Sequence, residues 1–487
     1  MHVPGVRPVN RLILVSNRLP VTAHVVDGEV TLERSSGGLA SGLAGPHERS
    51  GGIWIGWPGD LPRMSFAQRQ TLEESLKKQR IQPVYLNRAD VKGFYDEVSN
   101  GVLWPVLHYR LDQLPLHPVG WAEYRRVSEV FAQAAVAAYE PGDVIWVHDY
   151  HLFLVPGLIR EALPEAKIGF FLHVPFPSPD VFAVVPWRRE ILESVLAADL
   201  IGFHVSDYVK HFREACEDLL GLETTEKGVI FRGREARVDA FPLGIDVKFW
   251  RDLARRPDVI ARVAEIRSQA PGRMILTGID RLDYTKGILR RMVALELLFR
   301  ADPSLAERLR LIQVVVPSRE AIEPYSALKR RIDEIVGRIN GNYGTTADAP
   351  IRMLSRNLAP EDVTALYQAA DVMLVTPLRD GMNLVAKEFV AAREKEDGVL
   401  ILSEFAGAVD ELEGAIVVNP YDVEEMGAAI KRALEMPLAE QKQRMRRLRQ
   451  RVMQVDVGKW AEGFIATLGA TPDARRPERA EPTLPLS

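Results

Sequence analysis

The chain has 487 residues, of which 47% are hydrophobic and 26% charged; this composition is that of a soluble globular protein, and the length predicts two domains rather than one core. Lysine and arginine number 62 against 66 aspartate and glutamate, so the formal charge of −4 disfavours nucleic acid or an anionic membrane as the main partner. The single cysteine, Cys216, excludes an intramolecular disulfide and favours a reducing, cytoplasmic location.

The first predicted strand, residues 11–16, ends in Ser16-Asn17-Arg18 and places a guanidinium at a strand's carboxyl end. The run is too short for the core of a signal peptide or for a membrane span, which again predicts a cytoplasmic protein. The glycine-rich segment 35–45 is expected to be a turn that runs into a helix, where amides can meet an anion. A plain surface turn is the alternative. No GxGxxG follows the first strand, which disfavours a dinucleotide-dependent dehydrogenase.

Residues 94–109 offer an aromatic pair, Tyr95 and Trp104, in what we expect to be one loop and strand. Aromatic residues at this density more often belong to a core than to a ligand platform, although sugars do bind flat apolar faces. From this segment alone, the core interpretation is favoured.

Titratable side chains gather at the ends of the predicted strands 144–149 and 167–174. They are His148, Asp149, His151 and His173. A zinc site is the sharp alternative, but loop spacing without a nearby cysteine or carboxylate cluster disfavours it. An aspartate that binds a hydroxyl and a histidine that contacts a sugar fit better. For each single histidine, a structural role stands beside the catalytic one.

Three cations follow predicted strands in the second half of the chain: Arg281, Lys286 and Arg319. A solvated surface would scatter such charges along helices, whereas a group of them at strand ends predicts a phosphate clamp. No Asp-x-Asp pair occurs in the chain, so we expect no metal to bridge a diphosphate. Its charge would be met by the cations and by backbone dipoles.

A polar turn, Asp380-Gly381-Met382-Asn383, separates the predicted strand 371–377 from a helix. Its amides can bind sugar hydroxyls and diphosphate oxygens at the helix N-terminus. Glu388, one helical turn after Leu384, can accept two vicinal hydroxyls of a ribose. The alternative is an ordinary helix start with Asp380 as its N-cap. Beside the predicted clamp, the ligand-binding interpretation is favoured.

Apolar, β-branched runs alternate with helical stretches along the whole chain. They lie at 11–16, 144–149, 167–174 and 199–205, and then at 273–280, 311–316, 371–377, 398–403 and 415–420. Such runs predict parallel strands buried on both faces, and two sets of them predict an α/β fold of two doubly wound domains, 1–248 and 249–455. Ligands should bind in a cleft at the carboxyl ends of the strands. An amphipathic helix at 459–468 precedes a polar, proline-rich tail, 471–487, that is expected to be disordered.

A series of short motifs stands in a characteristic order. They are "SNRLP", "SSGGLASGL", "WIGWPG", "NGVLWPVLHY", "VHDYHL", "LHVPFPSPDVF", "LIGFHVSDY", "FPLGID", "DRLDYTKG", "PSRE", "VGRINGNYG" and "TPLRDGMNLVAKE". From about residue 10 to 468 the chain resembles the α,α-trehalose-phosphate synthases, a family of retaining glycosyltransferases. The resemblance implies the GT-B architecture of two facing Rossmann-like domains, with a helix at about 456–470 that crosses back onto the first. It implies transfer of glucose from UDP-glucose to glucose 6-phosphate, giving α,α-trehalose 6-phosphate and UDP, with no metal or other cofactor.

The resemblance also implies roles for individual residues. The acceptor would lie among Arg18, Tyr95, Trp104, Asp149 and Arg319. The donor would contact Gly37, Gly38, His173, Arg281, Lys286, Leu358, Asp380, Gly381, Met382, Asn383, Leu384, Val385, Ala386, Lys387 and Glu388. Catalysis would rest on Asp149, His173, Arg281, Lys286 and Asp380. Because the leaving phosphate would itself take the acceptor's proton, this chemistry needs positioned charge more than a strong protein base.

The expected partners are small-molecule substrates, with neither nucleic acid nor membrane, and self-association is left open. Side chains do not separate UDP, GDP and ADP donors. Two alternatives stay open: a related enzyme with another acceptor, as in glucosylglycerol-phosphate synthases, and a catalytically silent sugar-phosphate sensor. A silent protein would be expected to lack Arg281, Lys286 or Glu388, and all three are present. No Asp-x-Asp-x-Thr phosphatase signature follows, so a separate phosphatase would act downstream.

Overall fold

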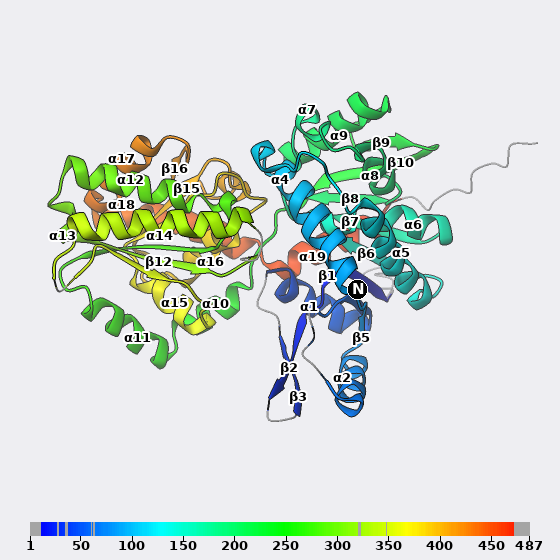
Figure 1. The fold of residues 1–487 in the computed structure, drawn as a ribbon, viewed down its shortest axis with the longest axis horizontal. Helices are drawn as coiled ribbons and strands as arrows, with labels where there is room; N and C mark the ends of the chain where they lie inside the picture. The colour runs from blue at the N-terminus through cyan, green and yellow to red at the C-terminus, as the bar shows by residue number, and fades with distance from the viewer. Residues whose placement is uncertain are drawn as a thin grey trace, which may run out of the picture. The chain divides into compact units, whose positions relative to one another are not determined.

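In a computed structural model of the chain, the described residues are 11–26, 29–34, 38–59, 61, 64–319, 323–346 and 348–471. They form two compact units (Figure 1). The N-terminal unit holds the chain up to Phe241 and again from Ala461, and the C-terminal unit runs from Pro242 to Trp460. The division therefore falls slightly before the predicted boundary at residue 248.

The N-terminal unit is built on an eight-stranded sheet in the order β5-β4-β1-β6-β7-β8-β10-β9. Neighbouring strands pair in parallel except β9 and β10. The strands are β1 (Leu12–Arg18), β4 (Ile53–Trp57), β5 (Ile81–Pro83), β6 (Val144–His148), β7 (Lys167–Phe171), β8 (Leu200–Phe203), β9 (Gly228–Phe231) and β10 (Arg234–Ala240). A separate hairpin joins β2 (Val21–Val26) and β3 (Glu29–Arg34). The strand order reverses between β1 and β6, which makes their carboxyl ends the switch point where ligands of such sheets bind.

The helices of this unit lie between the strands in the chain. They are α1 (Gly38–Ser50), α2 (Phe66–Lys78), α3 (Arg88–Asp90), η1 (Val91–Leu103), α4 (Trp104–Leu107), η2 (Leu111–Gln113), α5 (Trp121–Ala138), η3 (Tyr150–Leu152), α6 (Val155–Ala162), α7 (Pro179–Phe182), α8 (Arg188–Val195) and α9 (Ser206–Leu220). The helix α2 begins with a capping box, in which Ser65 and Gln68 each bond the other's backbone amide.

The segment 94–109 corrects the sequence analysis, which placed Tyr95 and Trp104 in a loop and strand. Instead, α3, η1 and α4 form one continuous helical stretch, and η1 has wide i→i+5 turns. Its buried residues include Phe94, Val98 and Val102, which recur at a helical rather than a strand spacing. The aromatic and β-branched content favoured a strand, but the burial period decided the element.

The C-terminal helix, α19 (Val457–Gly469), begins in the C-terminal unit and ends in the N-terminal one. In the N-terminal unit, Phe464 stacks on Trp146 of β6, with ring centroids 4.3 Å apart. Gly169 and Gly202 make this approach possible, because a Cβ on either residue would lie 2.7 Å from the Phe464 ring. The C-terminal part of α19 thus packs against the sheet of the N-terminal unit.

The C-terminal unit contains a fully parallel six-stranded sheet in the order β13-β12-β11-β14-β15-β16. The strands are β11 (Met274–Arg281), β12 (Leu309–Val316), β13 (Ile351–Leu354), β14 (Val372–Val375), β15 (Val399–Ser403) and β16 (Ile416–Val418). In chain order this is the doubly wound 3-2-1-4-5-6 arrangement, and its switch point lies between β11 and β14.

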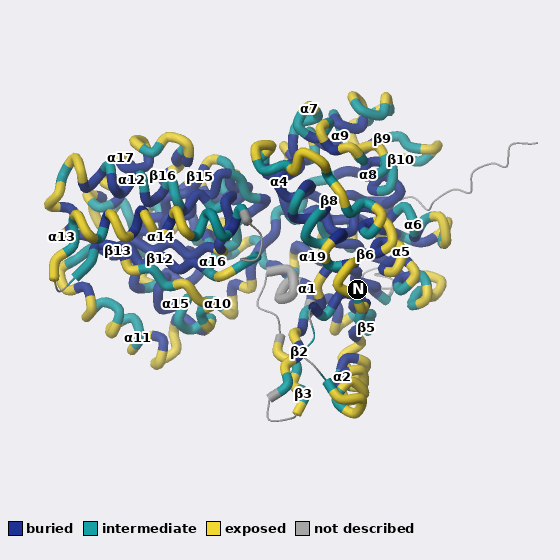
Figure 2. Tube along the Cα trace, in the orientation of Figure 1, coloured by how far each residue is buried: buried dark blue, intermediate teal, exposed yellow. Residues whose placement is uncertain are grey.

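The helices of the C-terminal unit cover both faces of this sheet (Figure 1). They are α10 (Val247–Ala254), α11 (Pro257–Ser268), η4 (Tyr284–Lys286), α12 (Ile288–Ala301), α13 (Leu305–Arg308), α14 (Glu323–Tyr343), α15 (Pro360–Ala369), α16 (Leu384–Ala392), η5 (Gly407–Asp410), α17 (Val423–Glu435) and α18 (Leu438–Gln454). In both units the central strands are buried and the outer turns of the helices are exposed (Figure 2). This explains why the strands are continuous apolar runs in the sequence.

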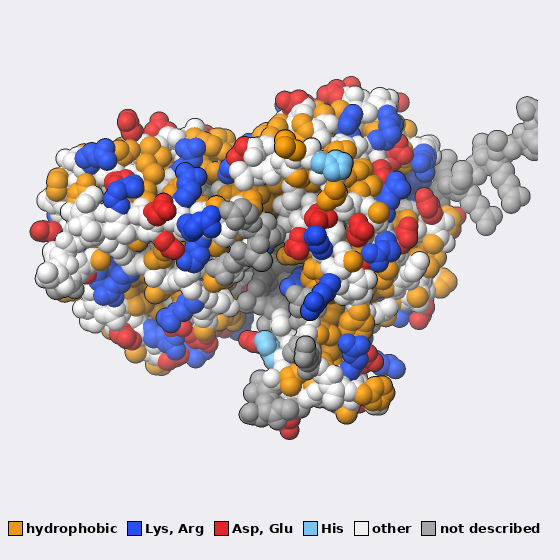
Figure 3. Space-filling view, viewed as in Figure 1, with side chains coloured by type: hydrophobic (Ala, Val, Ile, Leu, Met, Phe, Trp, Pro, Cys, Tyr) orange, Lys and Arg blue, Asp and Glu red, His pale blue; other side chains and the backbone are white. Residues whose placement is uncertain are grey.

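The predicted fold class is confirmed: each of the nine apolar runs predicted as buried parallel strands overlaps an observed parallel strand, and each unit has helices around a largely or fully parallel sheet. On the face shown in Figure 3, basic and acidic side chains are interspersed over both units. Among the described residues, the helices include none with the length and apolar character needed to span a bilayer. Residues 472–487 of the predicted tail, and residues 35–37 of the glycine-rich turn, lie outside the described residues.

Candidate active site

Arg18 ends β1 at the switch point of the N-terminal unit. Its guanidinium lies 4.4 Å from the ring centroid of Trp57, its register partner at the end of β4. Gly59 gives the side chain room, since a Cβ at that position would lie 2.0 Å from a guanidinium nitrogen. The arginine is exposed, so an aromatic face holds a cation at the strand ends while the charge meets solvent.

Tyr95 packs edge-on against the same Trp57 ring, with centroids 5.7 Å apart, and it stacks on His151 at 5.8 Å. The structure therefore brings Arg18 and Tyr95 to one aromatic group, and their role in binding the acceptor stays a prediction. Sequence reasoning missed Trp57. The signal was available, because Trp57 ends the apolar run "IWIGW" in the manner of the other site residues.

Trp104 lies deeper than Tyr95. It is only 4% exposed, and its ring contacts Tyr150 and His108 at centroid distances of 5.7 and 4.0 Å. The core role that the sequence left open for this residue accounts for these contacts. Its role in binding the acceptor stays a prediction.

Asp149 directly follows β6, and its carboxylate ties two strand ends together. The backbone N–H of His173, just beyond β7, donates to Asp149 Oδ1 at 3.2 Å. The other oxygen lies 3.8 Å from Nδ1 of His151. The carboxylate is half-buried and retains exposure at the switch point, where it could accept a hydroxyl.

Two neighbouring imidazoles lie behind this carboxylate. His148 Nδ1 and His173 Nε2 are 3.1 Å apart. Burial lowers the pKa of His148 to about 3, and burial followed by the charges of His148 and His204 holds the pKa of His173 well below its usual range. Both are therefore neutral at physiological pH, which suits hydrogen bonding to a sugar rather than charge pairing with a phosphate. Among the described residues, no three His, Cys, Asp or Glu side chains are grouped so that they could hold a metal ion.

The predicted clamp residues lie at the carboxyl ends of β11 and β12, in the C-terminal unit. Lys286 Nζ donates to Asp380 Oδ2 at 2.6 Å, so two of the three residues predicted to be catalytic in this unit are in direct contact. Arg319 lies 3.7 Å from Asp283, a buried carboxylate that sequence reasoning missed. Burial alone would raise the pKa of Asp283, but the charges of Arg319, Arg281 and Lys286 outweigh burial and lower it. The charges of all three cations therefore act on this one carboxylate.

Strained backbone occurs at several of the predicted site residues. Seven described non-glycine residues have positive φ, and three of them are Asp149 (75°), Arg319 (54°) and Asn383 (71°). Such conformations cost about 1–3 kcal/mol each and persist where the surroundings fix them, often at ligand sites. Their occurrence after strands β6, β12 and β14 supports a functional rather than an incidental reading of these loops.

The turn 380–383 differs from the ordinary helix start that the sequence left as an alternative. The N-cap of α16 is Asn383, whose Oδ1 accepts from the amide of Ala386 at 3.3 Å, so Asp380 is not the cap. Asn383 Nδ2 instead donates to Asp380 Oδ2 at 3.0 Å. The carbonyls of Asp380 and Met382 accept from the amides of η5 residues Gly407 and Ala408. The turn is therefore held through these two carbonyls and through the Asp380 amide, which donates to the Phe405 carbonyl at 3.0 Å. The Leu384 and Val385 amides stand before the capped Ala386 amide at the start of α16, where backbone N–H groups have no partner within the helix.

Glu388 lies on α16 and accepts a 2.8 Å hydrogen bond from the Tyr367 hydroxyl. Burial raises the pKa of Glu388 to about 7, although the hydrogen bond from Tyr367 acts in the opposite direction. A carboxyl poised near neutrality can accept hydroxyls once it ionises.

Other predicted donor contacts are placed less directly. Lys387 is buried, and its ammonium donates to the carbonyl of Leu243 at 2.8 Å and to Glu411. Because the side chain is engaged in these bonds, Lys387 could contact a ligand only through its backbone. Leu358 is half-buried in the loop before α15. Gly38 is the first residue of α1, and Gly37 lies outside the described residues.

A buried arginine underlies the switch point of the C-terminal unit. Arg291 is fully buried, and it donates to Asp280 and Gln313, each at 2.7 Å, and to Thr376 Oγ1 at 3.2 Å. It thereby joins the end of β11 to the segment that follows β14. Gly278 leaves room for it, because a Cβ there would lie 2.3 Å from the guanidinium.

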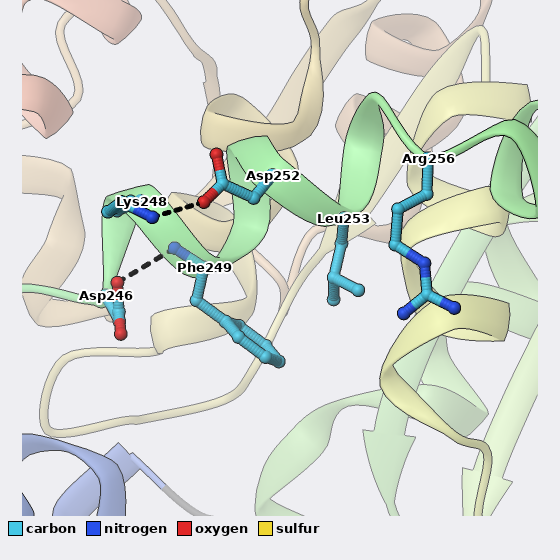
Figure 4. Close-up of a pocket in the computed structure, with 6 residues that line it drawn as sticks. All are labelled: Asp246, Lys248, Phe249, Asp252, Leu253 and Arg256. Carbon is cyan, nitrogen blue, oxygen red and sulfur yellow. Dashed lines mark hydrogen bonds and ion pairs between the residues drawn. The ribbon is translucent and has the colours of Figure 1, made fainter.

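A surface hollow of about 410 Å³ lies on α10 (Figure 4). It is lined by Asp246, Lys248, Phe249, Asp252, Leu253 and Arg256. Its polar groups bond to one another along the helix, with Lys248 on Asp252 and the Phe249 amide on Asp246. None of the residues that line this hollow directly follows a strand of either sheet. The carboxyl ends of the strands therefore remain the better candidate for the active site.

Comparison with known proteins identifies the family of the chain. A family model described as glycosyltransferase family 20 matches residues 10–470. An α,α-trehalose-phosphate synthase (UDP-forming) of Dictyostelium discoideum is 41% identical over 94% of this chain, which spans 62% of that relative's length. An enzyme of the same name from Botryotinia fuckeliana is 40% identical over 94% of this chain and 88% of its own.

Solved structures share the fold over nearly the whole chain. An E. coli protein bound with UDP-2-fluoro glucose has a TM-score of 0.86 and 33% identity, over 95% of this chain and 100% of its own. A Burkholderia xenovorans α,α-trehalose-phosphate synthase in complex with glucose-6-phosphate has a TM-score of 0.84 and 33% identity, with the same coverage. The N-terminal domain of a Candida albicans trehalose-6-phosphate phosphatase has a TM-score of 0.87 and 31% identity, over 96% of this chain and 98% of its own. On the family match and these identities, the chain belongs to glycosyltransferase family 20.

Proposed function

We propose that the chain transfers glucose from UDP-glucose to glucose 6-phosphate with retention, giving α,α-trehalose 6-phosphate and UDP. The observation that carries the proposal is the cation group of the C-terminal unit, where Arg319 lies 3.7 Å from Asp283, the charges of Arg281 and Lys286 also act on Asp283, and Lys286 contacts Asp380. Both proposed substrates carry phosphate, which needs cations to bind it. The glucose that is transferred carries hydroxyls, which a carboxylate can accept. The curated relatives are named for this reaction, which supports the same substrates.

The ion pair of Lys286 and Asp380 suggests how the donor would be received. The two side chains neutralise each other at 2.6 Å. When the donor binds, its diphosphate would compete for the ammonium, and its glucose hydroxyls would bond to the carboxylate. As the bond to the leaving phosphate breaks, charge builds on the diphosphate, where Lys286 and Arg281 act most strongly. The site needs no close pair of carboxylates for this chemistry.

The acceptor side would use separate groups. Arg18 on its Trp57 face, with Tyr95 beside it, offers a cation and an aromatic edge, and Asp149 offers an oxygen for a hydroxyl. Arg319, which also donates to the Tyr325 hydroxyl at 2.8 Å, would bind the acceptor phosphate. The neutral His173 would contact the transferred sugar.

A catalytically silent sugar-phosphate sensor is the second candidate. The likeness to a domain of a phosphatase favours it, because this fold is shared by proteins named for another activity. The ion pair of Lys286 with Asp380, together with the presence of Arg281 and Glu388, favours the enzyme.

The test is to mix the purified protein with UDP-, GDP- or ADP-glucose and with glucose 6-phosphate, glycerol 3-phosphate or free glucose. Nucleotide release and product mass are then measured. We expect UDP release and a trehalose 6-phosphate product with the UDP-glucose and glucose 6-phosphate pair. Turnover with glycerol 3-phosphate alone would assign another acceptor, and tight binding without turnover would assign a sensor.

We further propose that the reaction runs without a metal, in the cytoplasm, and that a separate phosphatase removes the product's phosphate. The absence of an Asp-x-Asp pair from the sequence supports the first point, and the single cysteine supports the second. The third follows from the chemistry of the product, a sugar phosphate that this chain has no signature to hydrolyse.

A further inference from the structure

One buried carboxylate, Asp283, connects groups that we assign to two different substrates. Its side chain is only 2% exposed, at the end of the loop that follows β11. On one side lies the turn η4, which carries Lys286 on the donor side. On the other lies Arg319, assigned to the acceptor phosphate. None of the site predictions from the sequence used this residue.

The two oxygens of the carboxylate have different tasks. Oδ1 accepts from both the amide and the hydroxyl of Thr285, each at 2.9 Å, and the Asp283 carbonyl accepts from the Lys286 amide at 3.1 Å. These bonds fix the short turn that presents the ammonium. Oδ2 faces the Arg319 guanidinium at 3.7 Å. A shift of the carboxylate would therefore move the support of both cations at once.

Arg319 is constrained from a second direction. It donates to the Tyr325 hydroxyl at 2.8 Å, and burial raises the pKa of Tyr325 to about 12, so this partner stays a neutral phenol. Its backbone is left-handed, with φ of 54°. Asp283 is thus the anionic partner of a cation whose backbone is held in a strained conformation.

The charge of Asp283 also limits how strongly the group attracts anions. A carboxylate this deeply buried is stable only with opposite charge around it. The charges of Arg319, Arg281 and Lys286 supply that stabilisation, and they keep Asp283 ionised at neutral pH. In return, the carboxylate cancels part of the field that the three cations would otherwise direct at any small anion.

We propose that Asp283 is a positioning residue that fixes Arg319 relative to Lys286 and reduces the affinity of the cation group for free inorganic phosphate. The inference rests on the proposed function for the identity of the substrates. The second part of the proposal, the reduced affinity for inorganic phosphate, can be tested by binding measurements without any turnover. Free inorganic phosphate would then bind weakly to these cations. Substrates whose phosphates match the spacing of the cations would bind better.

Asp283→Asn tests the charge, because its amide oxygen can still accept from Thr285. We expect inorganic phosphate, titrated by calorimetry in the absence of substrates, to bind about tenfold tighter than in the wild type. We also expect kcat to fall and the KM for glucose 6-phosphate to rise, with a smaller change in the KM for UDP-glucose. Unchanged or weaker phosphate binding in the folded variant would overturn the inference.

Asp283→Glu separates charge from position. It keeps the negative charge but displaces it by one methylene, so phosphate affinity should stay near the wild-type value while kcat falls. Wild-type kcat in this variant would overturn the positioning role. Glu296→Gln is the matched control: it removes another arginine-paired carboxylate of the same unit, bonded to Arg338 at 2.8 Å, and should leave phosphate affinity unchanged.

If Asp283→Asn does not fold, as thermal denaturation would reveal, Thr285→Val decides the question. It removes one bond to Oδ1 and leaves every charge in place, so we expect lower kcat with unchanged phosphate affinity. Wild-type kcat would then refute the inference. If the wild-type protein releases no UDP with any acceptor, the proposed function fails, whereas the phosphate titrations still test the role of the charge.

Discussion

The raised pKa of Glu388 has a measurable consequence for stability. Burial moves this pKa from an ordinary 4.5 to about 7. The folded protein therefore favours the protonated form, so this stabilisation is complete below about pH 4.5 and is lost as the pH rises through about 7. Glu388→Gln has no such titration and can still accept from the Tyr367 hydroxyl, which makes it the matched neutral substitution.

The magnitude follows from the difference in pKa. A pKa difference of about 2.5, at roughly 1.4 kcal/mol per pKa unit, gives at most about 3.5 kcal/mol between the two limits. The partial exposure of Glu388 lowers this figure, so we expect about 1–3 kcal/mol. At pH 8.5 the ligand-free Glu388→Gln protein should be more stable than the wild type by this amount. At pH 5 the difference should nearly vanish.

Urea denaturation at pH 5, 7 and 8.5 measures this difference, provided that the slope with denaturant is the same for both proteins. Glu296→Gln is a control of opposite sign. The hydrogen bond from Arg338 lowers the pKa of Glu296, so its contribution is present above the ordinary value and is lost as the pH falls through the lowered one. A Glu388→Gln gain that is independent of pH, or a loss at pH 8.5, would refute the reasoning.

The same carboxyl should make donor binding depend on pH. Ribose hydroxyls donate to the ionised form, so UDP binding should release a proton when the pH is below about 7. Affinity should then weaken by up to about tenfold per pH unit below that point. Calorimetry in two buffers of different ionisation enthalpy measures the proton directly. In Glu388→Gln, the proton release should disappear.

Three further predictions address the proposed site. Activity should persist in excess EDTA, and a loss that Mg²⁺ restores would contradict the metal-free proposal. Lys286→Ala should lower kcat by about 2.7–4 kcal/mol of transition-state stabilisation, and a change in the donor KM alone would mean that it holds only the ground state. Arg319→Ala should shrink the preference for glucose 6-phosphate over free glucose and leave UDP affinity nearly unchanged. Full discrimination in that variant would refute the acceptor-phosphate assignment, since each charge-assisted bond is worth about 1.5–3 kcal/mol.

The strands of this fold were predictable because each is buried on both faces. Runs such as 144–149 and 311–316 contain few polar residues to obscure the pattern, and the structure has strands at both. The helical stretch 88–107 was not predictable in this way. Its glycines, aromatic residues and valines have low helix propensity, and what makes it a helix is packing that the local sequence does not encode.

The same distinction separates the site residues that were predictable from those that were missed. Arg281, Lys286 and Asp380 follow apolar strands, so their position in the sequence was enough to predict them as site residues. Trp57 and Asp283 are defined by their neighbours, which include Arg18 for the first and Arg319 for the second, and each neighbour is more than thirty residues away. A buried carboxylate is unfavourable by itself and becomes useful only when several cations converge on it. Such a residue supplies the geometry on which neighbouring cations depend, and its importance appears only once the fold has assembled its partners.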